Sequence, residues 1–396
     1  MSPRLDTDTV VVGLGAMGSQ ALWRLARNGV DAIGVERFSP GHDRGSSHGE
    51  SRIIRTAYLE GSEYVPLVHA AWHAWDELQE ASGAELVVRT GALMLGRPES
   101  PAIAGSVTAA ERHGLSYARL SPSDLAERHP RHRVRHDEEG VFEEAAGVVL
   151  PERAVLAAVN EARRAGARVL TERTVTRIEP DPDRPRVWIG DTEIRARRVV
   201  VTVGAWLTRL LPGLADLGGG IRVERRVLGW FPITDPLSAS LEPVFARDEA
   251  DGTLWYGFPS MDGGRTLKIG IHAEGPETRA PEGRRPGSQW GEPVDPDIGP
   301  RPPDAADARR LGALVAGLRG VAPTPERTVS CMYTMTSDEH FLIGRHDELP
   351  GLVLAGGFSG HGFKFASAVG EALADLAGEG RTDLPIGMFD PHRWDG

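Results

Sequence analysis

The hydrophobic and polar positions near the start of the chain predict a strand, a helix and a second strand. Residues 10–12 are three valines, a β-branched run of the kind that fills a buried parallel strand. Apolar residues then recur with helical spacing over residues 19–28, and this segment ends at Gly29, a common helix stop. A second apolar run over residues 31–35 predicts the next strand. This order indicates a βαβ unit at the start of a nucleotide-binding domain.

Three glycines lie between the first predicted strand and the helix. Gly13, Gly15 and Gly18 have the spacing G-x-G-x-x-G. The first permits a tight turn, the second lets a pyrophosphate approach the backbone, and the third lets the helix pack closely on the strand. Glu36 ends the second strand 18 residues after Gly18, where a carboxylate accepts hydrogen bonds from both ribose hydroxyls. The motif therefore favours FAD or NAD over NADP, and it does not choose between the first two.

The same analysis of apolar spacing predicts the elements of the remaining chain. Predicted helices cover residues 63–81, 121–127, 151–165, 304–318 and 367–377. Strands are predicted as a pair over residues 86–96, as a buried run over 199–203 and as an antiparallel sheet over 221–272. The buried run meets a tight turn at Gly204 that leads into a helix, and a second backbone segment would approach the cofactor there. Eight prolines within residues 273–303 predict a surface excursion with little regular structure.

These elements predict an α/β fold with two interleaved domains. The nucleotide-binding domain would be Rossmann-like and built from residues 1–85, 145–220 and 325–390. The substrate-binding domain would be built on the antiparallel sheet from residues 86–144 and 221–324. A chain of 396 residues exceeds the usual span of one hydrophobic core, which supports the division into two domains.

Composition and charge narrow the classes of protein to which the chain can belong. Hydrophobic residues make up 40% and charged residues 26% of the chain, and no apolar run approaches the roughly 20 residues that span a bilayer. The net charge of −11 and the lack of a basic run argue against nucleic-acid binding. A single cysteine, Cys331, and the lack of an apolar signal region favour the cytoplasm. His129, His132 and His136 have no carboxylate or thiolate pattern around them, so we expect a solvated loop and no metal site.

Two glycine-rich segments carry the candidate chemistry. Residues 45–55 and 356–364 each combine glycines, which bring backbone N–H groups close to a ligand, with cations that point at it. Arg52 and Arg55 are three residues apart and would share one face of a helical turn. Lys364 precedes the last predicted helix, whose dipole adds to its charge. These cations would bind a substrate carboxylate or stabilise an anionic reduced cofactor; the alternative is that they are ordinary surface cations.

Seven stretches of the sequence are specific enough to indicate a family. They are VVGLGAMG, GSSHGESRIIRTAY, EYVPL, WYGFPS, LKIGIH, CMYTMTSDEHFLI and GFSGHGFKFAS, and they run from residue 10 to about residue 375. Together they resemble the monomeric sarcosine oxidase and N-methyltryptophan oxidase family of FAD enzymes. The resemblance implies FAD as the cofactor, so the nucleotide-binding domain would be an FAD-binding domain. It also implies a thioether between Cys331 and the 8-methyl carbon of the flavin.

The family pattern also implies roles for the cations. Arg55 and Lys364 match the clamp on the substrate carboxylate. Lys268 matches the lysine that activates oxygen, because nascent superoxide needs a fixed positive charge nearby. Arg52 and His48 match residues that are packed against the flavin ring.

The contacts of the cofactor and of the substrate follow from the same resemblance. Tyr256 and His272 match polar residues that line the substrate cavity, and with His48, Arg52 and Lys268 they complete the catalytic group. The residues that we expect to contact FAD are Gly13, Gly15, Ala16, Met17, Gly18, Glu36, Arg37, Ser47, Val175, Gly204, Trp206, Cys331, Gly357, Gly360, His361, Gly362, Phe363 and Lys364.

The implied reaction is the oxidation of a secondary amine, with sarcosine or another N-methyl amino acid as substrate. O2 accepts the electrons, and the products are formaldehyde, the primary amino acid and H2O2. The substrate would bind as the free amine without a general base, so activity would rise above neutral pH. Ala246 replaces a larger apolar residue that is familiar in the family, which predicts a roomier pocket.

Two alternatives to this function stay open from the sequence. The first is an oxidase of N-methyl-L-tryptophan or of primary-amine, cyclic or glycated amino acids on the same scaffold. The second is a nucleotide-binding redox sensor without turnover. The resemblance implies a monomer whose partners are a small amino acid and O2, with no nucleic acid and no membrane.

Overall fold

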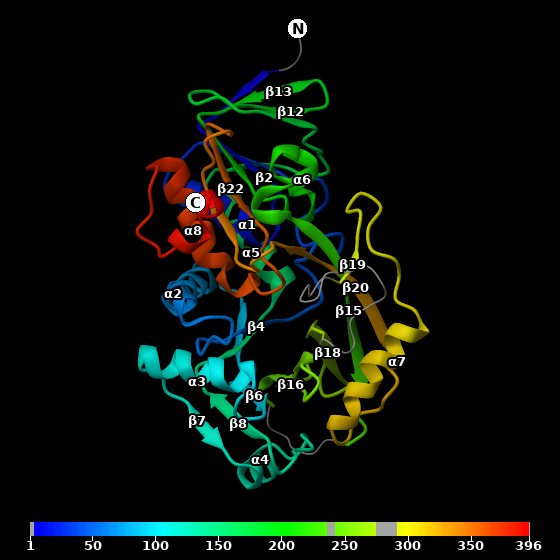
Figure 1. Cartoon of the computed structure of the whole chain (residues 1–396). Helices are drawn as coiled ribbons and strands as arrows, with labels where there is room; N and C mark the ends of the chain where they lie inside the picture. The colour runs from blue at the N-terminus through cyan, green and yellow to red at the C-terminus, as the bar shows by residue number, and fades with distance from the viewer. Residues whose placement is uncertain (1–3, 236–241, 275–290, 396) are drawn as a thin grey trace.

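A six-stranded sheet forms the centre of one half of the molecule, in a computed structural model that describes residues 4–235, 242–274 and 291–395 (Figure 1). The strand order is β10-β3-β2-β14-β22-β21. The strands are β2 (Thr9–Val12), β3 (Ala32–Val35), β10 (Arg168–Leu170), β14 (Arg198–Val201), β21 (Leu342–Gly344) and β22 (Leu352–Gly356). All neighbours pair in parallel except β21, which is antiparallel to β22. The βαβ unit and the second buried run predicted from the sequence are therefore confirmed as neighbours in one sheet.

Both faces of this sheet are covered, because its strands are apolar on both faces. Four helices cover one face: α1 (Ala16–Arg27), α2 (Val65–Ser82), α5 (Pro151–Arg164) and α8 (Ala366–Gly378). Val11 of β2 packs among these helices, whereas Val10 and Val12 point to the opposite face. A second sheet covers that face: β1 (Arg4–Asp6), β11 (Arg177–Glu179), β12 (Arg186–Ile189) and β13 (Thr192–Arg195).

A nine-stranded sheet forms the other half of the molecule (Figure 1). Its order is β19-β15-β18-β17-β16-β6-β8-β7, with β20 paired to β15. The strands are β6 (Ala92–Gly96), β7 (Ala118–Leu120), β8 (Glu139–Glu143), β15 (Arg222–Pro232), β16 (Val244–Asp248), β17 (Leu254–Phe258), β18 (Thr266–Ala273), β19 (Glu292–Pro293) and β20 (Arg327–Met335). The helices packed on it are α3 (Pro101–His113), α4 (Pro122–Arg128) and α7 (Ala305–Leu314). The predicted antiparallel sheet over residues 221–272 is confirmed by the pairs of β15, β16, β17 and β18.

A small three-stranded sheet joins the two halves. It has the order β4-β9-β5 and comprises β4 (Arg52–Ile54), β5 (Val87–Arg89) and β9 (Gly147–Val149). Val149 of β9 belongs to the core of the helices, whereas its neighbour Val148 packs in the core beside the nine-stranded sheet. Because adjacent side chains of a strand point to opposite faces, this strand is held by both cores.

Two expectations about local structure are wrong, and a third holds only in part. Residues 86–96 are not a strand pair, because β5 and β6 belong to different sheets. Arg52 and Arg55 do not share a helical turn, because Arg52 begins the extended strand β4. The helix expected after Gly204 is reduced to a 3₁₀ turn and the four residues of α6 (Leu207–Leu210).

The histidine-rich segment also differs from expectation. His132 is buried, and its ring lies 4.6 Å from that of Phe245 in an edge-to-face contact. Burial, together with the nearby Arg247 and His129, lowers the pKa of His132 to about 3. The segment is therefore partly core rather than a solvated loop. Within the described part of the chain, no group of three or more His, Cys, Asp or Glu side chains is placed to hold a metal ion.

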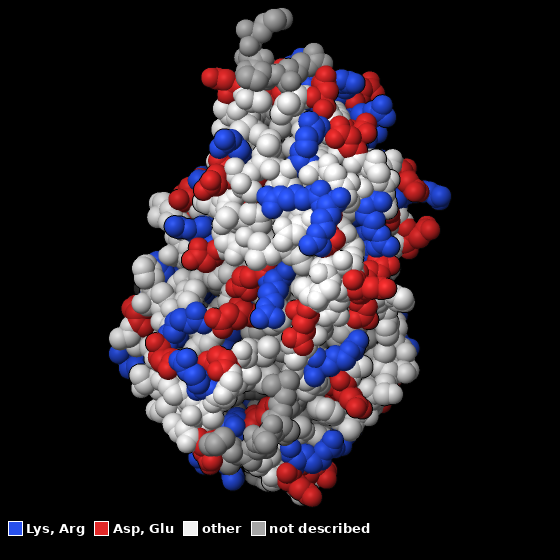
Figure 2. All heavy atoms as spheres, turned by 180° about the vertical axis from the view of Figure 1, so that it is seen from behind, with Lys and Arg blue, Asp and Glu red and all other residues white. Residues whose placement is uncertain are grey.

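The six-stranded sheet takes its strands from residues 9–35, 168–201 and 342–356, whereas β20 pairs with β15 in the nine-stranded sheet. The exact domain boundaries stay a prediction. No helix in the described ranges is long and apolar enough to cross a membrane. Figure 2 shows basic and acidic side chains interspersed over the back face of the molecule.

Candidate active site

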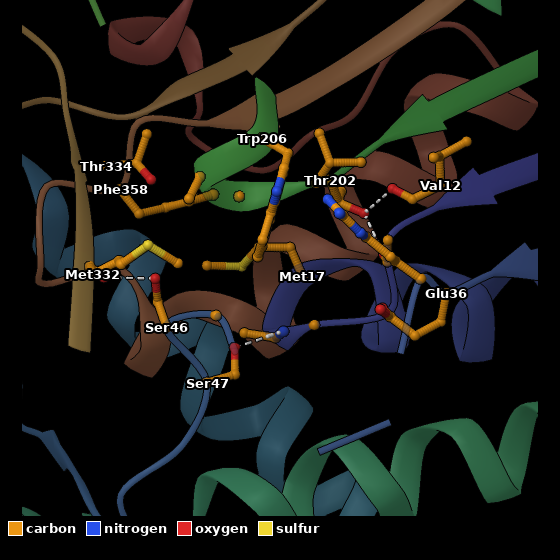
Figure 3. Close-up of a pocket in the computed structure, with 18 of the residues that line it drawn as sticks. Val12, Met17, Glu36, Ser46, Ser47, Thr202, Trp206, Met332, Thr334 and Phe358 are labelled. Atoms are coloured by element: carbon orange, nitrogen blue, oxygen red, sulfur yellow. Dashed lines mark hydrogen bonds between the residues drawn. The ribbon is translucent and has the colours of Figure 1, made fainter. Parts of the chain in front are cut away.

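The glycine turn between β2 and α1 forms one wall of a cavity (Figure 3). Gly13 has a φ of +87°, and a Cβ there would lie 2.8 Å from the carbonyl oxygen of Thr202. A Cβ at Gly18 would lie 1.8 Å from the carbonyl oxygen of Gly13. Gly15 is the N-cap of α1 and supplies no side-chain hydrogen bond to the first helical turn, which borders the cavity. Bare backbone at a helix N-terminus is suited to a pyrophosphate.

Glu36 ends β3 at the same cavity, as the sequence predicts. Its carboxylate accepts hydrogen bonds from the backbone N–H groups of Leu14 at 2.7 Å and Phe38 at 2.9 Å. Burial alone would raise the pKa of Glu36, but the interactions with His42, Phe38 and Leu14 outweigh it and lower the pKa below its usual value. A charged carboxylate thus lies where the ribose of a dinucleotide would bind.

This large cavity has a volume of about 380 Å³ and runs between the two halves of the molecule. Met17, Glu36, Ser47 and Trp206 lie around it in Figure 3. The predicted cofactor contacts that line it are Gly13, Gly15, Ala16, Met17, Glu36, Arg37, Ser47, Val175, Gly204, Trp206, Gly357, Gly360, Gly362 and Phe363. Gly18 lies behind the wall, where it allows close packing of α1. The other three predicted contacts line a second cavity.

The second cavity has a volume of about 80 Å³ and adjoins the first. Four residues line both: Arg52, Tyr333, Gly360 and Phe363. The predicted residues found only at the small cavity are Arg55, Tyr256, His272, Cys331, His361 and Lys364. The small cavity therefore brings together residues that are up to about 300 positions apart in the sequence, such as Arg55 and Lys364.

Arg55 is one of the two buried cations on the wall of the small cavity. Its Nη1 donates to the carbonyl oxygen of Ala57 at 2.6 Å, and its Nη2 donates to the carboxylate of Glu60 at 2.9 Å. Burial raises the pKa of Glu60, but Arg55 and Lys364 reverse this effect and lower the pKa to about 2. Glu60 therefore remains charged beside Arg55 and competes with any other carboxylate for this guanidinium group.

Lys364 is the other buried cation and lies in the turn before α8. Its Nζ donates to the carbonyl oxygen of His361 at 3.0 Å and to the hydroxyl of Tyr58 at 3.3 Å. Burial, with Arg55 adding to it and Glu60 opposing it, lowers the pKa of Lys364 to about 7. Its charge is therefore sensitive to pH near neutrality.

Lys268 of β18 lies beneath the loop that precedes β4 and lines neither cavity. Its Nζ donates to the carbonyl oxygens of Gly49 at 2.5 Å and Ser51 at 3.0 Å, and to the hydroxyl of Ser51 at 3.0 Å. Burial and the charge of Arg52 hold its pKa well below the usual value. Of the 45 Lys and Arg residues in the chain, only Lys268 and Lys364 are lysines. A compact ammonium group is thus confined to these two buried positions.

Arg52 and His48 lie on the same loop as these acceptors. Arg52 borders both cavities, and its guanidinium group donates to the carbonyl oxygens of Ser46 at 2.6 Å and Ser51 at 2.8 Å. His48 is buried and lines neither cavity. Burial and the adjacent Arg52 lower the pKa of His48 to about 4, so its imidazole is neutral near pH 7.

Tyr256 and His272 lie on neighbouring strands at the small cavity, as the resemblance implies. Burial raises the pKa of Tyr256 well above its usual value, and Tyr256 shares a hydrogen bond with Tyr333. Burial lowers the pKa of His272 to about 4, with Glu60 opposing the shift and Arg226 and Lys364 adding to it. Both side chains are therefore neutral hydrogen-bonding groups at neutral pH.

Cys331 of β20 lies where the two cavities meet. Its thiol borders the small cavity, while the next residues, Met332, Tyr333 and Thr334, border the large one (Figure 3). Burial raises the pKa of Cys331, and the charges of Arg52 and Lys268 act in the opposite direction. Burial outweighs these charges, so the pKa of Cys331 stays above its usual value, and the cations only limit the cost of forming the nucleophilic thiolate.

Asp297 is one of several residues that line the large cavity and that the sequence analysis did not identify. Asp297 lies in the proline-rich segment, and its carboxylate accepts hydrogen bonds from Arg37 at 2.8 Å and from Trp206 Nε1 at 3.0 Å. The adjacent Asp295 accepts a hydrogen bond from Arg209 at 2.7 Å. Residues 275–290 of the predicted excursion lie outside the described residues. Residues 291–303 lie at the surface with little regular structure, as predicted, and Asp297 ties this part of the segment to the cavity as a strap. The Asp-x-Asp spacing is the only sequence signal that marks it.

Comparisons with known proteins assign the chain to a family. The family model for FAD dependent oxidoreductases matches residues 8–376. The chain is a member of this family. The monomeric sarcosine oxidase of Streptomyces avermitilis is 37% identical, covering 99% of this chain and 98% of that protein. The N-methyl-L-tryptophan oxidase of Citrobacter koseri is 33% identical, covering 93% and 94% of the two chains.

Solved structures agree with this assignment at the level of the fold. The structure of NikD, described as an unusual amino acid oxidase essential for nikkomycin biosynthesis, has a TM-score of 0.84 and 24% identity over 98% of both chains. This FAD-dependent oxidoreductase is therefore a flavin-dependent enzyme with the fold of the amino acid oxidases. Its recognised relatives include oxidases named for two different N-methyl amino acids.

Proposed function

We propose that this chain is an oxidase that demethylates N-methyl amino acids, with sarcosine as the first candidate substrate. The observation that carries the proposal is the pair of buried cations, Arg55 and Lys364, on the wall of a small cavity that adjoins the cofactor-sized cavity. Two cations at one site are suited to a carboxylate. The same cavity is also lined by apolar side chains, which would suit a methyl group: Ile53, Leu59, Ala246, Leu254 and Phe258.

FAD, when bound, supplies the hydride acceptor for conversion of the N-methyl amine to an imine, which water hydrolyses to formaldehyde and the primary amino acid while O2 is reduced to H2O2. The glycine turn and Glu36 would hold its adenosine diphosphate moiety. Cys331, at the junction of the cavities, would bond the flavin covalently. Lys268 would supply the fixed positive charge for oxygen reduction, and Arg52 and His48 would pack near the ring. Tyr256 and His272 would orient the substrate.

A second candidate substrate class is N-methyl amino acids with larger side chains, such as N-methyl-L-tryptophan. Ala246 favours it, because this small side chain lies on the cavity wall and pairs with Tyr256 across the sheet. The volume of about 80 Å³ favours a small substrate. Cyclic and glycated amino acids, and a redox sensor without turnover, are the outcomes to be excluded.

Peroxide detection with sarcosine, N-methyl-L-tryptophan, L-proline and fructosyl-glycine tests the proposal. We expect peroxide and equimolar formaldehyde with an N-methyl amino acid. Peroxide from L-proline alone, or no turnover with any substrate, would contradict it. Acid precipitation tests the covalent bond: a yellow pellet is expected from the native chain and a colourless one from Cys331→Ala. We further propose that the enzyme is a cytoplasmic monomer, which light scattering and cell fractionation would check.

A further inference from the structure

One tyrosine ring lies beneath both cations of the clamp. The guanidinium carbon of Arg55 lies 5.0 Å from the ring centroid of Tyr58, and Nζ of Lys364 lies 4.7 Å from it. Tyr58 is fully buried and packs against Tyr64 and Phe365, with ring centroids 4.9 and 5.4 Å away. Attraction between a cation and an aromatic face is stronger when water is excluded. The ring of Tyr58 therefore helps to fix where the two charges lie.

The hydrogen bonds around His361 have only one consistent direction. Burial lowers the pKa of His361 to about 3, so the imidazole is neutral and carries one proton. Its Nε2 lies 3.0 Å from the carbonyl oxygen of Glu339, a group that only accepts, which assigns the proton to Nε2. Its Nδ1 must then accept a hydrogen bond from the Tyr58 hydroxyl, 2.6 Å away. The Tyr58 oxygen in turn accepts the hydrogen bond from Nζ of Lys364.

We propose that Tyr58 and His361 are positioning residues that hold Lys364 as an ammonium ion aimed at the substrate carboxylate, an inference that rests on the proposed function. An ammonium group has three N–H donors. Two of them are directed to the Tyr58 hydroxyl and the His361 carbonyl oxygen. The third is left for a ligand in the small cavity, because the described residues offer Lys364 no other acceptor. His361 acts through Tyr58, since its ring accepts the proton that would otherwise point toward Lys364.

The charge of Lys364 depends on a balance of neighbouring groups. Arg55 and burial favour the neutral amine, whereas the Glu60 carboxylate favours the ammonium ion. His272 and His361 are neutral near pH 7. The Tyr58 oxygen accepts a hydrogen bond from Nζ of Lys364 in either protonation state. This hydrogen bond stabilises the ammonium form more than the neutral amine. Removing this hydroxyl should therefore lower the pKa of Lys364 further. As the pH is raised, the affinity for a carboxylate should then begin to fall at a lower pH than it does in the native chain.

The chain contains a matched control in a second tyrosine–histidine pair. The Tyr64 hydroxyl is 2.7 Å from Nδ1 of His340, and the Tyr64 ring packs on that of Tyr58. Neither Tyr64 nor His340 contributes a hydrogen bond to Lys364. Tyr64→Phe and Tyr58→Phe each remove one buried hydroxyl from the same aromatic cluster. Only Tyr58→Phe removes one of the two acceptors of Lys364 Nζ.

The experiment measures the pKa of Lys364 directly in the holoenzyme. Because the chain has only two lysines, labelling with [15Nζ]lysine gives two side-chain signals, and Lys268→Met assigns them. We expect Tyr58→Phe to lower the pKa of Lys364 by about one unit and Tyr64→Phe to leave it unchanged. Titration with methoxyacetate, a carboxylate of the size of sarcosine, should show roughly tenfold weaker binding to Tyr58→Phe at pH 8.

Two further variants keep the inference testable if Tyr58→Phe does not fold. His361→Asn retains an acceptor near the position of Nδ1 and should shift the pKa of Lys364 less than His361→Leu. Equal titration of Lys364 in the native chain and in either Tyr58→Phe or His361→Leu would overturn the positioning role, even if methoxyacetate binds. Failure of the native holoenzyme to bind methoxyacetate at any pH would instead overturn the carboxylate clamp and the proposed function with it.

Discussion

The two adjoining cavities are built from different parts of the polypeptide. The large one is walled to a great extent by backbone, at glycine turns that follow β2, β14 and β22. The small one is walled by charged and aromatic side chains from the loop after β4, from β17 and β18, and from the turn before α8. We propose that backbone geometry holds the cofactor that is common to the family, whereas side chains of the small cavity select the substrate. Substitutions in the large cavity should therefore impair cofactor binding, and substitutions in the small cavity should impair substrate binding.

The largest effect is expected from a side chain in the glycine turn. Gly18→Val places a Cβ 1.8 Å from the carbonyl oxygen of Gly13, and backbone atoms cannot move away as a flexible side chain can. We expect the purified protein to lack flavin absorbance and to lose stability by at least roughly 1–3 kcal/mol. Gly213→Ala is the control, because a Cβ there meets no atom within 4 Å. Normal flavin content in Gly18→Val would contradict the backbone-built cofactor site.

Removal of a clamp cation should spare the cofactor and weaken substrate binding. Arg55→Ala leaves the partly buried Glu60 without its ion-pair partner and removes one of the two buried cations from the small cavity. We expect a loss of roughly 2–5 kcal/mol in carboxylate binding, measured by methoxyacetate titration, with unchanged flavin content. Arg44→Ala, an exposed arginine nearby in the chain, is the control and should change neither quantity. Loss of flavin from Arg55→Ala would contradict the proposal that one cavity binds the cofactor and the other binds the substrate.

Lys268 lines neither cavity, and its substitution tests the role in oxygen reduction that we propose for it. Lys268→Met should leave anaerobic flavin reduction by substrate nearly intact and slow reoxidation by O2 about a hundredfold, because a fixed positive charge is lost. The variant also leaves the acceptors on Gly49 and Ser51 without their donor, so a lower melting temperature is expected. Stopped-flow absorbance separates the two half-reactions. Equal slowing of both half-reactions would contradict the proposed role in oxygen reduction.

The pH dependence of kcat/KM should reflect ionisable groups of the small cavity and not those of the large one. The free amine of the substrate increases with pH, whereas the ammonium form of Lys364 decreases through its pKa of about 7. The sequence alone predicts a rise above neutral pH, but with Lys364 included we expect kcat/KM to rise roughly tenfold per pH unit up to about pH 7 and then to level, because the two changes cancel. Retention of FAD should not change over the same range. A continued tenfold rise per unit to pH 9 would show that Lys364 keeps its charge in the free enzyme.

The smallest effect is expected at the strap over the large cavity. Asp297→Asn weakens a half-exposed ion pair with Arg37, and such pairs contribute about 0.2–1 kcal/mol. In a Cys331→Ala background, where FAD would not be covalently bound, FAD dissociation should become up to about fivefold faster. Asp295→Asn is the control, because Asp295 pairs with Arg209 and does not line the cavity. Equal effects of both variants would assign the strap a purely structural role.

The sequence predicted those parts of the fold that local signals determine. The glycine spacing and valine run identify β2 and α1, and the antiparallel sheet follows from apolar alternation and turn residues. The partners of short strands were not predictable in this way. β5 and β6 are separated by only two residues. Nevertheless β5 pairs with β9, whereas β6 pairs with β16 and β8, because the two strands pack in different hydrophobic cores.

The small cavity was predictable only through the resemblance to a family. Nothing local places Arg55 beside Lys364, since their neighbourhood depends on how the two halves of the molecule pack. The extended conformation of Arg52, the burial of His132 and the contact of Asp297 with Arg37 were missed for the same reason. Each depends on a partner more than 90 residues away, and the local spacing of residues gives no information about such a partner.

The confinement of both lysines to the interior has a consequence for the outside of the enzyme. The other 43 of the 45 Lys and Arg side chains are guanidinium groups, which aldehydes attack far less readily than primary amines. If the reaction releases formaldehyde, the departing product meets no lysine amine on the surface with which to form adducts or cross-links. An enzyme that releases formaldehyde would thus be protected from modification by the lack of lysine side chains on its surface.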